Sequence, residues 1–307
     1  MNNSNTRRDF LKTSLIAPAA LAAANPWIAS AAETPAEPLH KPGAKMRIGL
    51  CTYLWGQDWD LPTLLANCKK AGYPGIELRV DHAHKVSAKL TPDERKAVKK
   101  QFTDAKITFV GMGCNWDFHH TDPAKVAASL EGAKADVILS RDCGGSGAKV
   151  KPNGLPKEVS VAKTCEQIAN ALNDLGKFAA DYKQEIRVEA HGTGTSDLPV
   201  MKQIFDHVTA PNVGICWNCN GEDVKGEGLE HNFKLVNKRF STILHAREFN
   251  IGDYPYQQLF DLLVAMDYKG WILLEARTAP KDRVAAMIEQ RGVFEQMIKN
   301  AQAKLLK

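Results

Sequence analysis

The sequence predicts a single (β/α)8 barrel, an α/β fold in which eight parallel strands alternate with eight helices. Short β-rich apolar runs alternate with longer runs of helical periodicity over residues 46–307. The expected strands begin roughly 32 residues apart, which is the size of one βα unit. No glycine-rich phosphate loop follows the first expected strand, where an open doubly wound sheet would place one.

Each expected strand is a short run of apolar residues, and each expected helix is a longer amphipathic run. The strands are expected at Arg47–Leu54, Gly75–Val80, Ile107–Gly113, Ala148–Lys151, Ile186–Ala190, Val213–Trp217, Thr242–Ala246 and Trp271–Ala276. The helices are expected at Leu61–Ala71, Pro92–Ala105, Pro123–Cys143, Val161–Lys183, Leu198–Val208, Leu229–Arg239, Tyr256–Met266 and Asp282–Lys304. The glycines at 144, 145 and 147 precede a strand and not a helix, so they indicate a helix stop and a turn.

The N-terminus has the pattern of an export signal. Arg7 and Arg8 precede a mild apolar stretch over Ser14–Ala24, and a small-x-small cleavage pattern ends at Ala31. These features predict a twin-arginine signal peptide in residues 1–31, cleaved near Ala31. We therefore expect a periplasmic or secreted mature protein that engages the twin-arginine (Tat) export machinery.

The rest of the chain has the composition of an ordinary globular protein. Residues 32–45 contain three prolines and are expected to be a flexible lead-in to a catalytic barrel domain over residues 46–307. With 40 Lys+Arg against 35 Asp+Glu, the net charge of +5 is too small to indicate nucleic acid as a partner. No run in the mature chain reaches the about 20 apolar residues that span a bilayer. The sequence leaves the oligomeric state open, a homo-oligomer included.

The seven cysteines favour free core thiols over disulfides. Their number is odd, and a chain that folds before export forms its core in a reducing compartment. Cys216 and Cys219 have the spacing of a redox or zinc pair, but no second pair follows them. We therefore expect buried thiols at these positions.

Polar side chains gather at the carboxyl ends of six of the eight expected strands. In a (β/α)8 barrel these ends form one face, and residues two apart on a strand point the same way. The residues are Glu77 and Arg79, Lys149 and Lys151, Glu189 and His191, Asn218, His245 and Arg247, and Glu275 and Arg277. Their convergence predicts a site for a polyhydroxylated or anionic ligand.

Four of these residues have the donor types of a divalent metal site. Glu189, Asn218, His245 and Glu275 come from four consecutive strands. Two carboxylates, an imidazole and an amide carbonyl suit Mn²⁺, Mg²⁺, Co²⁺ or Zn²⁺. A metal-free ring of salt bridges with the neighbouring arginines is the alternative. Charge balance permits it, but it does not by itself account for the imidazole and the amide.

The segments around these positions follow one another in a familiar order. They are Gly72–Gly75 before Ile76–Arg79, then Val188–Glu189, Val213–Asn218, Leu244–His245 and Leu274–Glu275. In this order the chain resembles the xylose-isomerase-like TIM barrel superfamily, specifically its sugar (phosphate) isomerase/epimerase branch, over residues 46–305. The resemblance implies that Glu189, Asn218, His245 and Glu275 hold a divalent metal. The family has Asp where this chain has Asn218, which removes one negative charge.

The resemblance also implies a reaction, namely the isomerisation or epimerisation of a keto-sugar or sugar derivative, and the predicted export signal favours an unphosphorylated one. Glu189 and Glu275 are then the catalytic pair, because one carboxylate removes the proton α to a carbonyl and the other returns it from the opposite face. Residues expected to contact the sugar are Glu77, Lys151, His191, Arg247, Arg277 and Trp116. Trp116 belongs to an aromatic and polar segment that ends in His119 and His120, for which metal ligation is the less favoured interpretation.

Two other functions stay open. A lyase or dehydratase that acts on a keto-sugar or a 3-keto-glycoside would use the same proton abstraction and then expel a β-leaving group. A non-catalytic carbohydrate-binding barrel would follow if Asn218 marks a metal site that has decayed.

Overall fold

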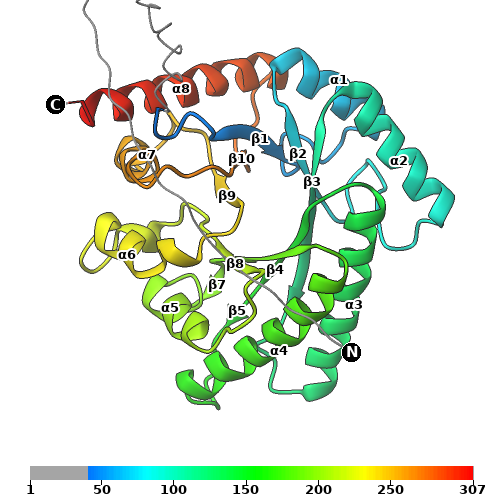
Figure 1. The fold of residues 1–307 in the computed structure, drawn as a ribbon, viewed down its shortest axis with the longest axis vertical. Helices are drawn as coiled ribbons and strands as arrows, with labels where there is room; N and C mark the ends of the chain where they lie inside the picture. The colour runs from blue at the N-terminus through cyan, green and yellow to red at the C-terminus, as the bar shows by residue number, and fades with distance from the viewer. Residues whose placement is uncertain (1–40, 307) are drawn as a thin grey trace, which may run out of the picture. The chain divides into compact units, whose positions relative to one another are not determined.

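The computed structural model describes residues 41–306 of the 307-residue chain. Eight parallel strands form a nearly closed barrel in the order β8-β6-β4-β3-β2-β1-β10-β9 (Figure 1). The strands are β1 Arg47–Cys51, β2 Gly75–Arg79, β3 Thr108–Asp117, β4 Gly147–Lys151, β6 Glu185–Glu189, β8 Val213–Cys216, β9 Ile243–Ala246 and β10 Trp271–Leu274. At the β8–β9 seam, Ser241 donates its backbone N–H to Ile215 and His245 donates to Trp217, both at 2.8 Å. The predicted fold class is confirmed.

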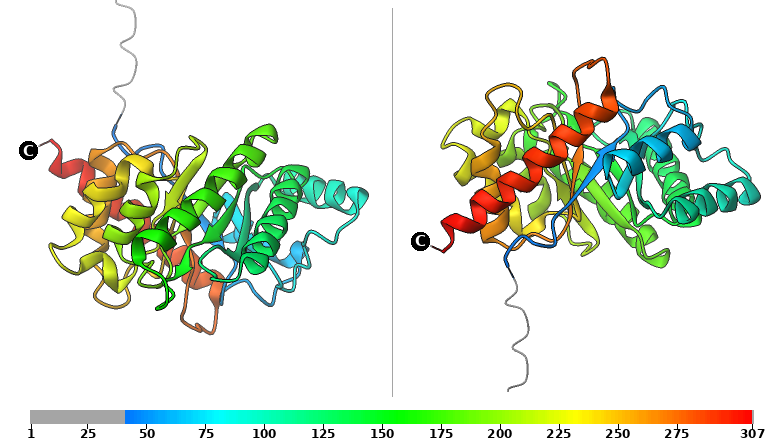
Figure 2. Two further views of the ribbon diagram at one scale, coloured as in Figure 1. Left: turned by 90° about the horizontal axis from the view of Figure 1, so that it is seen from below. Right: turned by 90° about the horizontal axis from the view of Figure 1, so that it is seen from above.

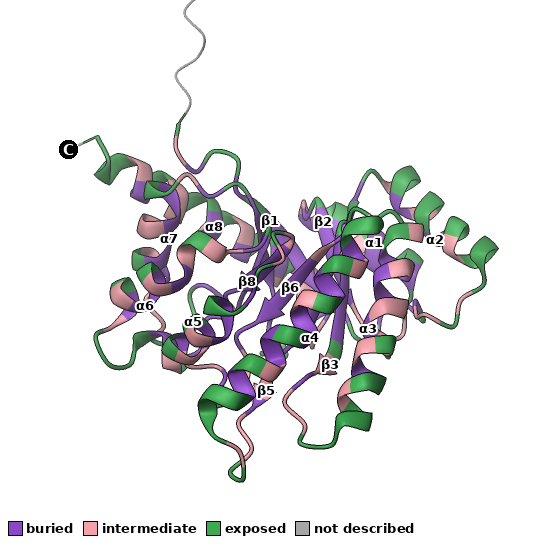
Figure 3. Cartoon of the chain, turned by 60° about the horizontal axis from the view of Figure 1, so that its bottom comes forward, coloured by how far each residue is buried: buried purple, intermediate pink, exposed green. Residues whose placement is uncertain are grey.

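Within residues 41–306, eight α-helices surround the strands and alternate with them along the chain. They are α1 Leu61–Ala71, α2 Pro92–Ala105, α3 Pro123–Asp142, α4 Val161–Asp181, α5 Leu198–Asp206, α6 Leu229–Val236, α7 Tyr256–Ala265 and α8 Arg283–Lys304. Each lies within a few residues of its predicted range. The helices bury one side against the strands and expose the other (Figure 3), while α8 packs against both α7 and α1 (Figure 2).

The helix ends follow from the local sequence. Side chains of Asp60, Thr91, Ser160 and Asp282 accept hydrogen bonds from the first turns of α1, α2, α4 and α8. Gly72 ends α1 with a φ of 75°, a left-handed conformation that glycine adopts without strain. Capping of this kind is readable from the sequence, which is why these boundaries could be predicted.

Strand β3 differs from the prediction. It runs to Asp117, which pairs with Lys151 of β4, so part of the segment expected to be a loop is strand. The pairing of β2 with β3 also shifts by one residue between Phe109 and Gly111. The extra residue, Val110, is a β-bulge, and such a bulge changes which residues of a strand face the barrel interior.

Two short strands lie outside the main sheet. These are β5 Asn153–Gly154 and β7 Gly192–Thr193, which pair in parallel with each other. They follow β4 and β6 in the chain, and so tie together the loops after those strands. The predicted sixth helix also ends earlier than expected, with residues Asn237–Arg239 forming a separate 3-10 turn.

The residues before β1 need a correction. Residues 42–45, which we expected to belong to a flexible lead-in, form a turn. Gly43 donates its N–H to Asp267 at 2.9 Å, and the carbonyl of Pro42 accepts from Gln302 of α8 at 2.9 Å. These bonds make the turn part of the barrel. The predicted signal peptide and residues 32–40 lie outside the described residues. Within residues 41–306, no helix is long and apolar enough to cross a membrane.

All seven cysteines lie within the described residues, and all are buried and free. The expectation of core thiols is confirmed. We predict that thiol titration of the denatured, unreduced mature protein gives seven thiols per chain, because none of these sulfurs is joined to another. A result of one thiol and three disulfides would contradict the packing seen here.

Candidate active site

Three ionisable side chains from different strands meet inside the carboxyl-terminal end of the barrel. Glu189 ends β6, His245 lies in β9, and Glu275 directly follows β10. One donor atom from each lies within 4.8 Å of the others, and all three residues are buried. The structure thus brings together three of the four residues predicted to hold a metal.

The fourth residue, Asn218, lies two positions after the end of β8. Strand β8 lies between β6 and β9 in the barrel. Asn218 is 2% exposed, and its amide nitrogen donates weakly to the side chain of Asn220 at 3.4 Å. The Asn218 Oδ1 atom is buried and has no hydrogen-bond partner among the described residues. The Nδ1 atom of His245 is likewise buried and unpartnered.

Buried polar atoms without a partner cost about 1–3 kcal/mol each, so proteins seldom keep them without a use. An oxygen and an imidazole nitrogen are atoms that a divalent cation binds. The residues present therefore fit a metal ion, with Asn218 in place of the acidic ligand.

Glu77 fixes the ring of His245. Its Oε1 atom lies 2.9 Å from His245 Nε2, and both side chains are fully buried. Burial opposes ionisation of both groups, yet the attraction between them lowers the pKa of Glu77 and raises the pKa of His245. A carboxylate that holds one imidazole nitrogen leaves the other nitrogen for a metal, a common arrangement around metal-ligating histidines. We expected Glu77 to contact the sugar, but the structure places it behind His245 instead.

Lys149 of β4 is a site residue to which we assigned no role from the sequence. Its Nζ atom lies 2.5 Å from Glu189 Oε2 and 3.2 Å from the carbonyl of Cys114, with the side chain fully buried. Burial opposes its charge, but Glu189 raises the pKa of Lys149, and Lys149 in turn lowers the pKa of Glu189 against the effect of burial. The sequence did contain a sign of this position, because Lys149 lies two residues before Lys151 and therefore points to the same face of the strand.

Glu275 is also held by cations. Arg79 donates to Glu275 Oε1 at 2.9 Å and to Asn115 at 3.1 Å, while Arg277 lies 3.8 Å from the other oxygen of Glu275. Each carboxylate of the proposed catalytic pair therefore faces at least one fixed positive charge. Glu189 faces Lys149 in the barrel interior, and Glu275 faces arginines nearer to solvent.

Other predicted substrate contacts lie around this cluster. Lys151 ends β4, and burial followed by repulsion from Lys149 lowers its pKa. His191 Nδ1 lies 2.8 Å from Asn153 Oδ1, and Arg247 approaches Asn220 at 3.5 Å. The side chain of Arg277 is 42% exposed.

Trp116 is placed differently from our expectation. Its indole N–H donates to Asp136 of α3 at 2.7 Å, and a Cβ added to Gly132 of α3 would collide with the ring. The side chain therefore packs outward on α3 and not into the barrel mouth. The bulge at Val110 accounts for this, because beyond it Asn115 faces the interior and its neighbour Trp116 faces the helices.

The fold and the site together define a class of protein. The chain belongs to the xylose isomerase-like TIM barrel family, whose family model matches residues 65–297. Among characterised relatives it is similar to the inosose dehydratase of Mesomycoplasma hyopneumoniae strain 7448, with 22% identity over 77% of this chain and 90% of that protein. The inosose dehydratase of Clostridium tetani is also 22% identical, over 77% of this chain and 91% of that protein.

Solved structures share the same fold. An L-ribulose 3-epimerase has a TM-score of 0.72 at 16% identity and covers 85% of this chain and 97% of its own. The 3-keto-D-glucoside 4-epimerase of E. coli, in its apo form, has a TM-score of 0.69 at 15% identity, covering 82% and 100%. The IolI protein with a bound zinc atom has a TM-score of 0.71 at 14% identity, covering 83% and 99%.

Proposed function

We propose that this chain is a metal-dependent isomerase or epimerase that acts on an unphosphorylated keto-sugar or sugar derivative. The observation that carries the proposal is the buried cluster of Glu189, His245 and Glu275, whose donor atoms lie within 4.8 Å of one another. Asn218, at the same end of the barrel, adds a buried Oδ1 atom that has no hydrogen-bond partner within residues 41–306. The names of the related inosose dehydratases and of the sugar epimerases with the same fold support a carbohydrate substrate.

Glu189, Asn218, His245 and Glu275 would hold the metal, which is Mn²⁺, Mg²⁺, Co²⁺ or Zn²⁺ by the chemistry of these donors. When bound, such an ion polarises a substrate carbonyl and stabilises the negative charge that follows loss of the α-proton.

The protein's own residues would move the proton. One of Glu189 and Glu275 takes the proton from the carbon next to the carbonyl, and the other returns a proton from the opposite face. Lys149 donates to Glu189 and Arg79 donates to Glu275, and these hydrogen bonds fix the orientation of the two carboxyl groups. His191, Lys151, Arg247 and Arg277 lie further out, where they would bind the sugar hydroxyls.

A lyase or dehydratase is the second candidate, and the inosose dehydratase relatives favour it. It would use the same proton abstraction, followed by loss of a leaving group from the β-carbon. We propose that His191 protonates that group from Nε2 in its imidazolium form, while its Nδ1–H donates to Asn153 Oδ1.

The predicted export signal supports an unphosphorylated substrate, because sugar phosphates are intracellular metabolites. We accordingly propose a periplasmic or secreted location, on the strength of residues 1–31 alone.

Elemental analysis of the purified protein, combined with exchange of substrate protons in deuterated water, tests the proposed function. Exchange at the α-carbon of an unphosphorylated keto-sugar supports proton abstraction, and release of a leaving group would identify a lyase. A metal-loaded protein that binds such a sugar without exchange would be a binding protein and would refute the enzymatic proposal.

Replacement of Asn218 by aspartate tests the fourth ligand. We expect Asn218→Asp to tighten metal binding by about 10- to 100-fold, because it adds a negative charge beside the cation in a partly desolvated site. Isothermal titration of both proteins with Zn²⁺ or Mn²⁺ measures the change. Asn170→Asp, which adds the same charge on the exposed side of α4, is the matched control. Equal affinities for wild type and Asn218→Asp would remove Asn218 from the ligand set.

A further inference from the structure

A second cluster of metal-ligating side chains follows β3. His120 Nε2 lies 2.7 Å from Asp117 Oδ1, and His119 Nδ1 lies 3.9 Å from Asp117 Oδ2. One donor atom from each of the three residues lies within 4.8 Å of the other two. A tetrahedral zinc ion with bonds of about 2.0–2.1 Å needs its ligand atoms roughly 3.3 Å apart, a value between these two distances, which run to the two different oxygens of Asp117.

The ring of His119 is oriented as a metal ligand would be. Its Nδ1 atom is buried and has no hydrogen-bond partner in the described part of the chain, while the backbone of Pro152 hydrogen-bonds the ring. Because proline has no N–H, its carbonyl must accept, and the ring therefore donates from Nε2. This tautomer leaves the lone pair on the buried Nδ1.

Asp117 is held in place as well. Asn153 donates to Asp117 Oδ2 at 2.7 Å, and the other end of the Asn153 amide contacts His191 at 2.8 Å. Asn153 belongs to β5, which is paired with β7. Hydrogen bonds of this kind orient the ligands of known metal sites and contribute to their affinity.

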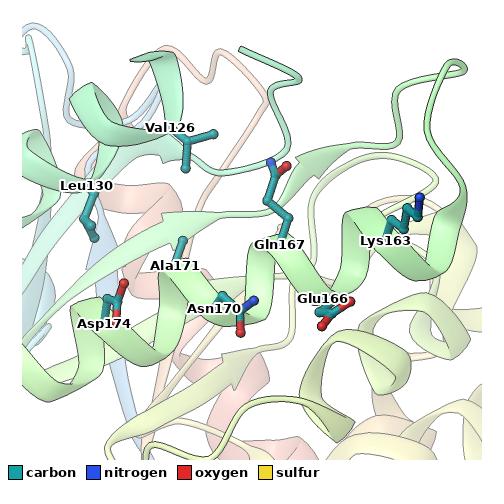
Figure 4. A pocket seen from close by; sticks show the side chains of 8 residues that line it. All are labelled: Val126, Leu130, Lys163, Glu166, Gln167, Asn170, Ala171 and Asp174. Carbon is teal, nitrogen blue, oxygen red and sulfur yellow. The ribbon is translucent and has the colours of Figure 1, made fainter. Parts of the chain in front are cut away.

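The backbone of the cluster is also fixed. Gln167 of α4 donates to the carbonyls of Phe118 and His120, at 2.8 and 2.9 Å, and the Phe118 side chain is fully buried. Gln167 stands on α4 in a groove that Val126 and Leu130 of α3 line from the other side (Figure 4). The two histidines are thus held close together before any ion arrives, which lowers the entropic cost of binding.

We propose that Asp117, His119 and His120 form a second divalent metal site, separate from the site at Glu189, His245 and Glu275. Two imidazoles and one carboxylate suit Zn²⁺ or another borderline transition metal, and are a poor set for Mg²⁺ or Ca²⁺. A fourth position stays open to water or to a substrate oxygen. This site goes beyond the proposed function and does not depend on it.

Zn²⁺ alone, titrated into the full-length mature protein, tests the proposal. We expect two zinc ions per wild-type chain by calorimetry and elemental analysis. The double variant His119→Asn/His120→Asn should bind one, and Glu189→Gln/Glu275→Gln should also bind one. Two ions retained by the histidine variant would overturn the second site. Two ions retained by the glutamine variant would instead count against the four-ligand site, so the two failures are distinguishable.

Affinity in the Glu189→Gln/Glu275→Gln background isolates the second site. In this background, Asn153→Gly removes the hydrogen bond to Asp117 and should weaken zinc binding about 10- to 100-fold. Glycine is chosen because it tolerates the φ of 70° at this position. His231→Asn is the matched control, because it removes an exposed histidine that lies 3.3 Å from Glu227 outside the cluster. Zinc affinity in this background that is insensitive to Asn153→Gly and to His119→Asn would show that the cluster is only a hydrogen-bonded loop. Thermal melts in chelator identify any variant that fails to fold.

Discussion

Replacement of Glu275 by glutamine is expected to lower turnover by about 10²- to 10⁴-fold, and Glu189→Gln by a similar factor. Each change removes a proton-transfer group, for which factors of this size are typical, and also a ligand of the proposed metal. Exchange of the α-proton in deuterated water, measured on the purified variants at saturating metal, gives the rate of the step concerned. Glutamine keeps an oxygen that accepts from Arg79 or Lys149, but Glu189→Gln also removes the negative charge paired with the buried Lys149. The melting temperature of both variants is therefore measured alongside the exchange rate.

The matched control for these variants is Glu230→Gln, which makes the same chemical change on the surface of α6. Glu230 is paired with Lys234 at 2.5 Å, and both side chains are exposed. We expect unchanged turnover in this control. Near-wild-type exchange in Glu189→Gln or Glu275→Gln would remove that residue from the proposed mechanism.

Replacement of Lys149 by methionine is expected to lower the free energy of unfolding by about 3–5 kcal/mol at neutral pH. The change leaves the Glu189 carboxylate buried without its cation, and breaking one side of a buried ion pair typically costs this much. For a barrel of this size the melting temperature should fall by roughly 6–20 °C. Chemical denaturation and calorimetric melts in chelator measure both quantities.

The loss of stability in Lys149→Met should depend on pH. Lys149 holds the pKa of Glu189 below its ordinary value in the folded protein, so the stability that the pair provides is present above the glutamate pKa of about 4.3 and is lost as pH falls below it. The difference between Lys149→Met and wild type should therefore be largest near neutral pH and shrink below about pH 4.

A divalent ion should partly replace the missing ammonium charge. Zn²⁺ is therefore expected to raise the melting temperature of Lys149→Met more than that of wild type. Lys96→Met removes a lysine that is 77% exposed and paired with Asp93, and should change stability by less than about 0.5 kcal/mol. A Lys149→Met protein as stable as this control would show that the buried pair does not stabilise the fold.

The sequence determined the barrel and the strand ends that form the site. Alternating β-rich and amphipathic runs set the eight βα units, and the fold itself brings Glu189, Asn218, His245 and Glu275 to one face. These features depend on periodicity and connectivity, which are local properties of the chain.

Only the tertiary structure decided how deep each polar residue lies and which partner it meets. Glu77 and Arg79 share a strand face, yet Glu77 binds His245 in the interior whereas Arg79 binds Glu275 nearer the mouth. The bulge in β3 likewise turned Trp116 out onto α3. Alternation along a strand fixes the side to which a residue points, but its depth depends on the stagger between strands and on bulges. The stagger and the bulges are set by packing among residues that are far apart in the sequence. Lys149 and Glu189 are one such pair, and their charges are stable in the interior only because the fold brings them together.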